Sequence, residues 1–225
     1  YYQNEADYKM DIELDDRNQK ITGRETITYH NNSPNDLEYL WVQLDQNIRS
    51  KDAVAKLKDG NGIVPVTQPG NFVSEYMDEP FDGGFNITEV SKEGKPLSHT
   101  INNTMMRINL PEPLKAGESY SFDIKWWYNI NEHTVDRGRS GFEHFSEDGN
   151  NAYVIAQFFP RMAVYNDVEG WQNYQFWGNG EFALPFGKYE VSITVPADHI
   201  VDGTGELQNR KEMWSKTMLK RYEKA

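Results

Sequence analysis

The sequence predicts an all-β fold, an antiparallel β-sandwich domain that ends in a short helix. Apolar and polar residues alternate at period two in several stretches, which is the pattern of half-buried strands. Aromatic residues make up 13% of the chain, and this high share suits pleated sheet surfaces better than helices. Clusters of Gly, Pro, Asn and Asp separate the alternating stretches, as turns do between strands. We therefore divide the 225 residues into a β domain over 1–208 and a basic helical segment over 209–225.

The first two predicted strands form a hairpin. The first strand covers residues 7–15, the turn residues 15–18 and the second strand residues 19–30. Glycine inside a strand often marks a bulge, so we expect one at Gly23. One face of the second strand carries Ile21, Gly23, Glu25, Ile27 and Tyr29.

The middle of the chain alternates between strands and irregular segments. Residues 37–44 are apolar on both faces and predict a strand buried on both sides. Residues 47–59 predict an irregular excursion with about one turn of helix, and residues 60–84, with five glycines and three prolines, predict a loop. Further strands are predicted over residues 85–90, 105–110 and 120–128.

After these strands the sequence becomes less regular. Residues 129–151 are polar and predict a long exposed loop, whereas residues 187–196 alternate and predict another strand. Between them lies the aromatic-rich stretch Tyr153–Glu181, in which Gly178–Gly180 predicts a hairpin turn.

The C-terminal segment differs from the rest in period and in charge. Trp214, Met218 and Tyr222 recur every four residues and predict one amphipathic helix. Residues 209–225 carry a net charge of +4 and the whole chain −12, so the other 208 residues carry −16. An acidic body lacks the basic surface that nucleic acids require, and no nucleic-acid partner is expected. No apolar run reaches the ~18 residues of a membrane helix, so we expect no membrane span.

The chain contains no cysteine, which excludes disulfides and thiolate metal sites. It begins at Tyr1 without a signal peptide. Such a start fits a chain from which a signal peptide has been removed, so we expect an exported bacterial protein, periplasmic or secreted.

The sequence contains no self-contained active site. Its five histidines lack the i, i+4 pairing of a helical zinc site, and the Glu, His and Asp residues at 132–144 are interpreted as a solvated polar loop. Ser140 lacks the flanking pattern of a nucleophile elbow. We therefore expect no catalytic residue, metal or cofactor within this chain.

The aromatic residues of Tyr153–Glu181 have two possible uses. They can fill a β core or an interdomain face, or they can form a platform on which sugars stack. We favour packing, because most aromatic side chains are used in this way. The residues concerned are Trp171, Tyr174, Phe176 and Trp177.

Several motifs in fixed order resemble the N-terminal domain of the zinc aminopeptidases related to aminopeptidase N and leukotriene hydrolase. The main ones are AQFFPRMAVYND at residues 156–167, followed by EGW at 169–171, and GKYEVSITVPAD at 187–198, followed by TGEL at 204–207. Supporting matches are ITG at 21–23, NNS at 31–33, LPEPL at 110–114 and AGE at 116–118. The resemblance covers most of the chain.

The resemblance implies a saddle-shaped β domain that covers a thermolysin-like zinc domain. It implies that Gln157 lies at the cleft and shapes the pocket for the first substrate residue and its amine, with Phe159 as a second substrate-binding residue. Many relatives carry Glu or Gln at the position of Phe159, so a polar group that would contact the amine directly is missing there. The chain also lacks the HExxH motif and the Gly-x-Met-Glu-Asn segment, and it stops within a basic helix, before the strands that normally return to complete the domain.

Three functions follow from these observations. The favoured one is the non-catalytic N-terminal domain of a zinc metallo-aminopeptidase-like protein that removes N-terminal residues from peptides. Its partners would be a peptide substrate and the catalytic domain of the same polypeptide, which would hold the zinc. The alternatives are a free-standing aromatic-rich β-sandwich that binds carbohydrate or protein and, least favoured, a hydrolase built on the loop from His133 to His144.

Overall fold

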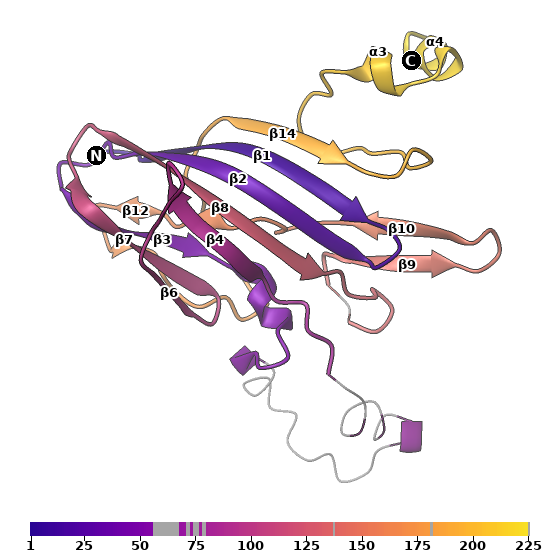
Figure 1. Cartoon of the computed structure of the whole chain (residues 1–225), viewed down its shortest axis with the longest axis horizontal. Helices are drawn as coiled ribbons and strands as arrows, with labels where there is room; N and C mark the ends of the chain where they lie inside the picture. Colours follow the sequence, from indigo (N-terminus) through magenta and orange to yellow (C-terminus); the bar gives the residue numbers. More distant parts are fainter. Residues whose placement is uncertain are drawn as a thin grey trace.

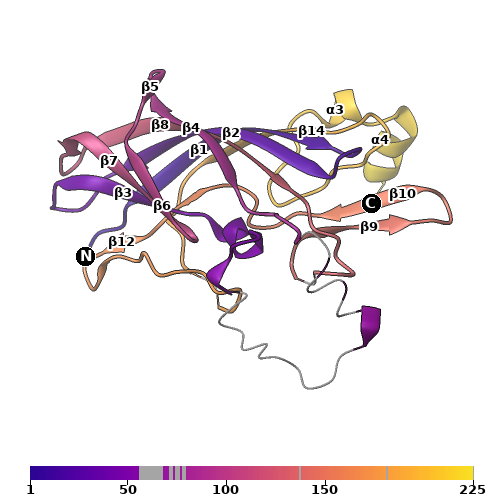
Figure 2. The ribbon, with the colours of Figure 1, turned by 60° about the horizontal axis from the view of Figure 1, so that its bottom comes forward.

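Two β-sheets form the body of the structure, a computed structural model that describes residues 1–55, 68–70, 73, 77, 80–136, 138–180 and 182–224. Figure 2 shows the smaller sheet and a long hairpin on the same side of the larger sheet, toward its two ends. This arrangement confirms the predicted all-β sandwich with a helical C-terminus.

The larger sheet has six strands, which cross the view of Figure 1 diagonally. Their order is β14 (Tyr189–Thr194), β1 (Glu5–Asp15), β2 (Lys20–His30), β8 (Ser119–Asn129), β4 (Asn86–Lys92) and β5 (Lys95–Pro96). All neighbours are antiparallel except β14, which runs parallel to β1. The predicted sandwich was fully antiparallel. The exception arises because the chain leaves the smaller sheet before β14, and Phe186 bridges to Glu5 at the end where β1 begins.

The smaller sheet has four strands and is accompanied by two hairpins. Its order is β11 (Arg161–Met162), β3 (Leu37–Gln43), β7 (Met105–Leu114) and β6 (His99–Asn102). The hairpins are β9 (Gly141–Phe145) with β10 (Asn150–Val154), and β12 (Tyr165–Asn166) with β13 (Gly170–Trp171).

The core lies between the sheets and is built from alternate residues of the long strands. Full burial of one large apolar side chain stabilises the fold by about 1.5–3 kcal/mol. The larger sheet contributes Tyr8, Met10, Ile12, Ile27, Tyr29, Phe122, Ile124 and Trp126, and the smaller sheet contributes Leu40, Val42, Met106 and Ile108.

The residues predicted to share one face of β2 do so, and that face is buried, but the predicted bulge at Gly23 is wrong. The strand pairs without interruption, with Gly23 opposite Ile12 on one side and Trp126 on the other. A Cβ at Gly23 would collide with the Trp126 ring. The glycine is therefore explained by the space that this ring occupies, and no extra residue interrupts the ladder.

The strand β3 is less buried than predicted. Leu40 and Val42 are fully buried, whereas Glu38 is exposed and Tyr39 and Trp41 are half-buried, so only one face lies against the core. The predicted excursion that follows contains a short 3-10 helix, η1 (Asp45–Arg49). The predicted loop over 60–84 falls mainly on positions outside the described residues.

Some strands are absent from the prediction. The predicted loop over 129–151 contains the β9–β10 hairpin, whose strands are mostly exposed on both faces and so lack an alternating pattern. The short strands β5 and β6 were also missed for the same reason, since every residue in them is exposed.

The C-terminal segment is helical, as predicted, but forms two short helices, α3 (Arg210–Met213) and α4 (Lys216–Tyr222). The break follows Trp214, and Ser215 caps α4 by accepting a hydrogen bond from the Met218 amide at 3.3 Å. The Trp214 and Tyr222 rings still pack together, with centroids 5.4 Å apart. Figure 1 shows both helices projecting from the body of the sandwich. Within the described part of the chain, every helix is too short or too polar to cross a bilayer.

Candidate functional site

A cavity of about 720 Å³ lies where η1 meets two irregular segments, one at residues 136–140 and the other at residues 176–180. Polar and apolar groups contribute to its wall. Its lining includes Arg49, Asp136, Arg139, Gln157, Phe176 and Trp177. A volume of this size is within the range of small-molecule and peptide side-chain pockets.

Arg49 is held at this cavity by η1. Its Nε donates to the Asp136 carboxylate at 3.1 Å, and its Nη1 reaches the Gln46 side-chain oxygen at 3.5 Å. Only 10% of the Arg49 side chain is exposed, against 48% for Asp136. Gly138 lies directly beside it, since a Cβ there would be 2.6 Å from Arg49 Nη2. The guanidinium is therefore a positioned and largely desolvated cation.

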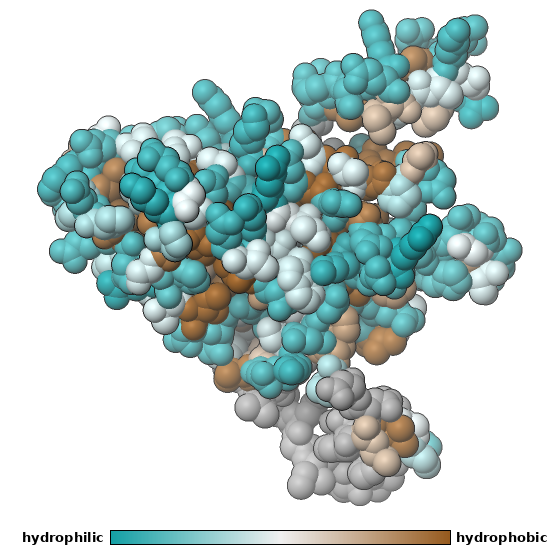
Figure 3. Space-filling view, viewed as in Figure 1, coloured by the Kyte–Doolittle hydropathy of each residue, from teal (hydrophilic) through white to brown (hydrophobic). Residues whose placement is uncertain are grey.

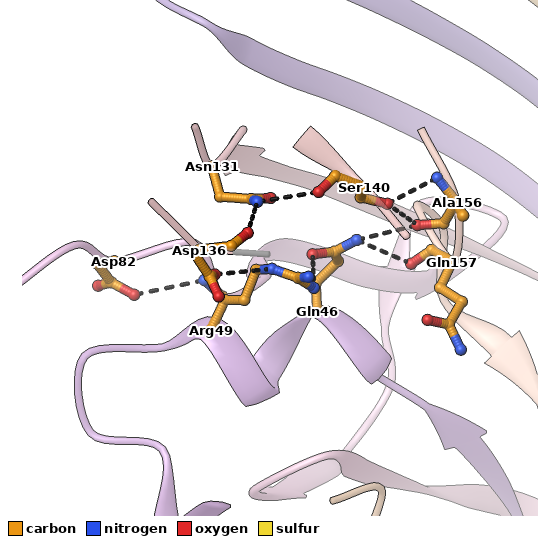
Figure 4. A network of polar contacts seen from close by, with 9 residues as sticks. Gln46, Arg49, Asp82, Asn131, Asp136, Ser140, Ala156 and Gln157 are labelled. Carbon is orange, nitrogen blue, oxygen red and sulfur yellow. Dashed lines mark hydrogen bonds and ion pairs between the residues drawn. The ribbon is translucent and has the colours of Figure 1, made fainter. Parts of the chain in front are cut away.

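The backbone at residues 156 and 157 is fixed by buried polar side chains (Figure 4). The Ser140 hydroxyl donates to the Ala156 carbonyl at 2.7 Å and accepts from the Ala156 amide at 2.8 Å. The Gln46 amide donates to the Ala156 and Gln157 carbonyls at 3.2 and 3.3 Å. Asn131 holds the facing loop by donating to the Asp136 and Ser140 carbonyls at 2.8 and 2.9 Å.

Gln157 lines the cavity in an unusual backbone conformation. Its φ is +53°, in the left-handed region that costs non-glycine residues free energy and is often found at functional positions. In Figure 4 its side-chain amide points away from the contacts that fix its carbonyl. Within the described part of the chain, that amide has no hydrogen-bond partner. Gln157 thus offers a donor and an acceptor to a ligand.

Phe159, the second predicted substrate-binding residue, lies in an aromatic cluster and not among the described residues that line the cavity. Its ring packs edge-on against Tyr8 at 5.5 Å and Phe158 at 5.0 Å, and contacts Tyr189 at 6.3 Å. The role that the structure supports for Phe159 is to anchor the segment that carries Gln157.

Buried polar groups lie behind this segment. Arg161 donates to Asp45, and both side chains are almost completely buried. The Tyr8 hydroxyl accepts from the Met162 amide at 2.9 Å. Glu25 is 2% exposed and neither of its carboxylate oxygens has a partner in the described structure. Burial raises the pKa of this carboxyl well above its usual range, because the charged form would lose its hydration.

The predicted polar loop at 132–144 does not assemble a metal site. Asp136 turns toward Arg49, whereas His144 lies in β9 and contacts Asn151 at 2.8 Å. In the described ranges, no group of three His, Asp or Glu residues could hold a metal ion.

The aromatic residues do not form one flat sugar platform. Trp171 packs against Tyr29 and Tyr165, with centroids at 5.8 and 5.2 Å, and Phe176 is buried. Tyr174 is 58% exposed and contacts Glu169. The four candidate rings are thus dispersed between the core, the surface and the cavity, which favours packing over carbohydrate binding.

The sequence reasoning missed Arg49, Asp136 and Arg139 as site residues. Arg49 belongs to a segment that was interpreted as irregular, and Asp136 to one interpreted as a solvated loop. The available signal was two arginines on either side of Gly138, at positions 137 and 139 in an otherwise acidic chain. In the sequence alone, nothing links these arginines to Arg49.

Comparisons with known proteins identify no relative by sequence. The chain matches no protein-family model and no curated protein. In structure it is similar to the M1 zinc metallopeptidase from Deinococcus radiodurans, with a TM-score of 0.43 at 10% identity. A mutant of that protein bound to a Tyr-Ser-Ala substrate matches with a TM-score of 0.42 at 12% identity. Both matches cover 92% of this chain and 37% of the metallopeptidase chain, so this chain spans just over a third of its length.

Proposed function

We propose that this chain is the non-catalytic N-terminal β domain of an exported zinc metallo-aminopeptidase-like protein and forms one wall of its peptide cleft. The observation that carries the proposal is the setting of Gln157. The residue that the sequence resemblance assigns to the cleft lies on a cavity wall, in a strained conformation and with an unbonded amide. Strained residues of this kind cluster at active sites and ligand-binding positions.

A neutral amide suits this role. It can donate to a peptide carbonyl and accept from a peptide N–H or an ammonium group without the cost of burying a charge. The network of Ser140 and Gln46 fixes the Gln157 backbone, so the amide is oriented before a ligand arrives. The domain would thereby restrict the cleft to chain ends and align the first residue of a peptide.

The proposal assigns the chemistry to the catalytic domain of the same polypeptide. A zinc ion bound there would supply an activated water for hydrolysis of the peptide bond. The present chain would contribute binding and orientation, which change the observed rate by holding the substrate in a reactive position.

Kinetics of the intact protein test this function. Gln157→Ala should lower kcat/KM for aminoacyl substrates about tenfold, the effect of losing one hydrogen bond of roughly 1.4 kcal/mol. Gln208→Ala, at an exposed position, is the matched control and should leave both constants unchanged. If Gln157→Ala leaves KM and kcat unaltered across several first residues, the cleft assignment is wrong. An intact gene product that releases no N-terminal residues would refute the aminopeptidase proposal itself.

A further inference from the structure

Arg49 has more hydrogen-bond donors than the described structure uses. A guanidinium carries five N–H groups and no acceptor. One donates to Asp136 at 3.1 Å, and one reaches Gln46 at 3.5 Å, the limit of a hydrogen bond. For the remaining three, the described part of the chain supplies no acceptor.

The Arg49 side chain is 90% buried, yet its Nη2, which has no partner in the described structure, is not among the buried atoms without a partner. Nη2 is therefore accessible at the cavity that Arg49 lines. A desolvated cation with open donors attracts an oxyanion strongly, because charge-assisted hydrogen bonds are about twice as strong as neutral ones.

The other residues that line the cavity indicate which kind of anion fits it. Phe176 and Trp177 supply an apolar surface beside the Arg49 guanidinium. A small inorganic anion would leave the apolar wall uncovered, whereas an organic anion with an apolar body would cover it.

We propose that this cavity binds a carboxylate of a peptide, held by Arg49, with a neighbouring apolar side chain of the peptide against Phe176 and Trp177. The inference rests on the proposed function, because it takes the ligand to be a peptide aligned by Gln157. It adds a preference for substrates that carry a negative charge close to their N-terminus. The carboxylate can come from an acidic side chain or from the C-terminus of a short peptide.

Calorimetric titration of the chain with paired peptides tests the proposal without any mutation. The tripeptide Ala-Phe-Ala with a free C-terminus is compared with its C-terminal amide, and amidated Ala-Phe-Glu is compared with amidated Ala-Phe-Gln. We expect at least one acid to bind about tenfold or more tightly than its neutral partner, given the strength of hydrogen bonds to charged groups. The pair that shows the difference identifies the source of the carboxylate.

Two variants connect this preference to Arg49. Arg49→Gln should reduce the difference between acid and neutral peptide to less than about twofold, whereas Arg24→Gln, which removes an arginine paired with Asp11 on the exposed face, should preserve it. Arg49→Lys keeps the positive charge but loses the two-pronged donor geometry of the guanidinium. It replaces Arg49→Gln as the test variant if Arg49→Gln does not fold. Equal binding of acids and neutral peptides by the unmodified chain overturns the carboxylate inference and leaves the peptide-binding proposal intact. A preference for acidic peptides that survives in both Arg49 variants also overturns the carboxylate inference. Failure of all four peptides to bind refutes both this inference and the peptide-binding proposal.

Discussion

Arg161 of β11 donates a hydrogen bond to Asp45 of η1 in the interior of the protein. The pair joins two of the segments that border the cavity, because Asp45 begins the 3-10 helix that ends at Arg49, and Arg161 follows Gln157 by four residues. Both side chains are more than nine-tenths buried, so neither can regain water if its partner is removed.

Removal of one partner should therefore destabilise the fold strongly. Arg161→Met removes the cation that donates to the buried Asp45 and is expected to lower the free energy of unfolding by about 3–5 kcal/mol in urea titrations. The double variant Asp45→Leu/Arg161→Met should be less destabilised than the sum of the single variants, because it removes the buried carboxylate together with the buried guanidinium.

A matched surface pair controls for the general loss of an arginine. Arg24 pairs with Asp11 at 2.8 Å, but their side chains are 69% and 45% exposed. Arg24→Met should change the free energy of unfolding by less than about 1 kcal/mol. Similar losses for Arg161→Met and Arg24→Met would show that the interior pair has no special role.

The extent to which sequence predicts this structure depends on burial. Strands β1, β2 and β8 have one buried face and one exposed face, so their period-two pattern is visible in the sequence. The β9–β10 hairpin has no such asymmetry, since contacts through its backbone hold it together and polar residues are tolerated on both faces. Its existence therefore could not be read from the composition of residues 129–151.

The candidate site was only partly predictable for a different reason. Gln157 was identified because its neighbours resemble a known motif. Arg49 carries no local signal, and it meets the segment of Gln157 only through long-range contacts such as that of Gln46 with Gln157, 111 positions apart. The cavity is a product of tertiary structure, so no local pattern encodes it.

The buried Glu25 predicts a stability that depends on pH. Its pKa is raised in the folded state, so the folded protein binds more protons than the unfolded chain above the usual pKa of a glutamate. The stability of the protein should thus fall as the pH rises from about 4.3, by up to about 1.4 kcal/mol per pH unit from this group until its folded-state pKa is reached. Glu25→Gln removes this dependence, so its advantage over the unmodified protein should grow from pH 5 to pH 8.

Urea unfolding across this pH range measures the effect. The matched control is Glu13→Gln, which removes an exposed carboxylate from the neighbouring strand and should run parallel to the unmodified protein. If the free energies of unfolding of Glu25→Gln and the unmodified protein differ by a constant amount across this pH range, Glu25 is charged in the folded state. The interpretation of its burial would then be wrong.

The contact between Gly23 and Trp126 predicts a penalty for any side chain at position 23. Gly23→Ala places a methyl group where it overlaps the ring atoms of Trp126. The variant should destabilise the protein by about 1–3 kcal/mol, the usual cost of overpacking. Gly203→Ala is the control, because no neighbouring atom would lie within 4 Å of its new Cβ. The combination of Gly23→Ala with Trp126→Leu should cost less than the sum of its parts. Equal unfolding midpoints for Gly23→Ala and Gly203→Ala would contradict the contact.

The left-handed backbone at Gln157 predicts that stability and binding change in opposite directions. Gln157→Gly relieves a conformational cost of about 1–3 kcal/mol, of which about 0.4–1 kcal/mol is lost again through the greater freedom of the unfolded chain. The variant should therefore unfold at a higher urea concentration, while its affinity for peptides falls because the amide is gone. Gln157→Ala loses the amide but keeps the strain, so it should weaken binding with no gain in stability.

Glu93 provides the control for this last prediction, since it has a similar φ of +51° in the turn between β4 and β5. Glu93→Gly should stabilise the protein to a similar degree and leave peptide binding unchanged. If Gln157→Gly gains stability and binds peptides as well as the unmodified chain, the left-handed backbone at Gln157 has a role only in the local chain path and none in peptide binding. If it loses stability, the side chain of Gln157 contributes to packing, and its role as a free amide at the cavity would have to be abandoned.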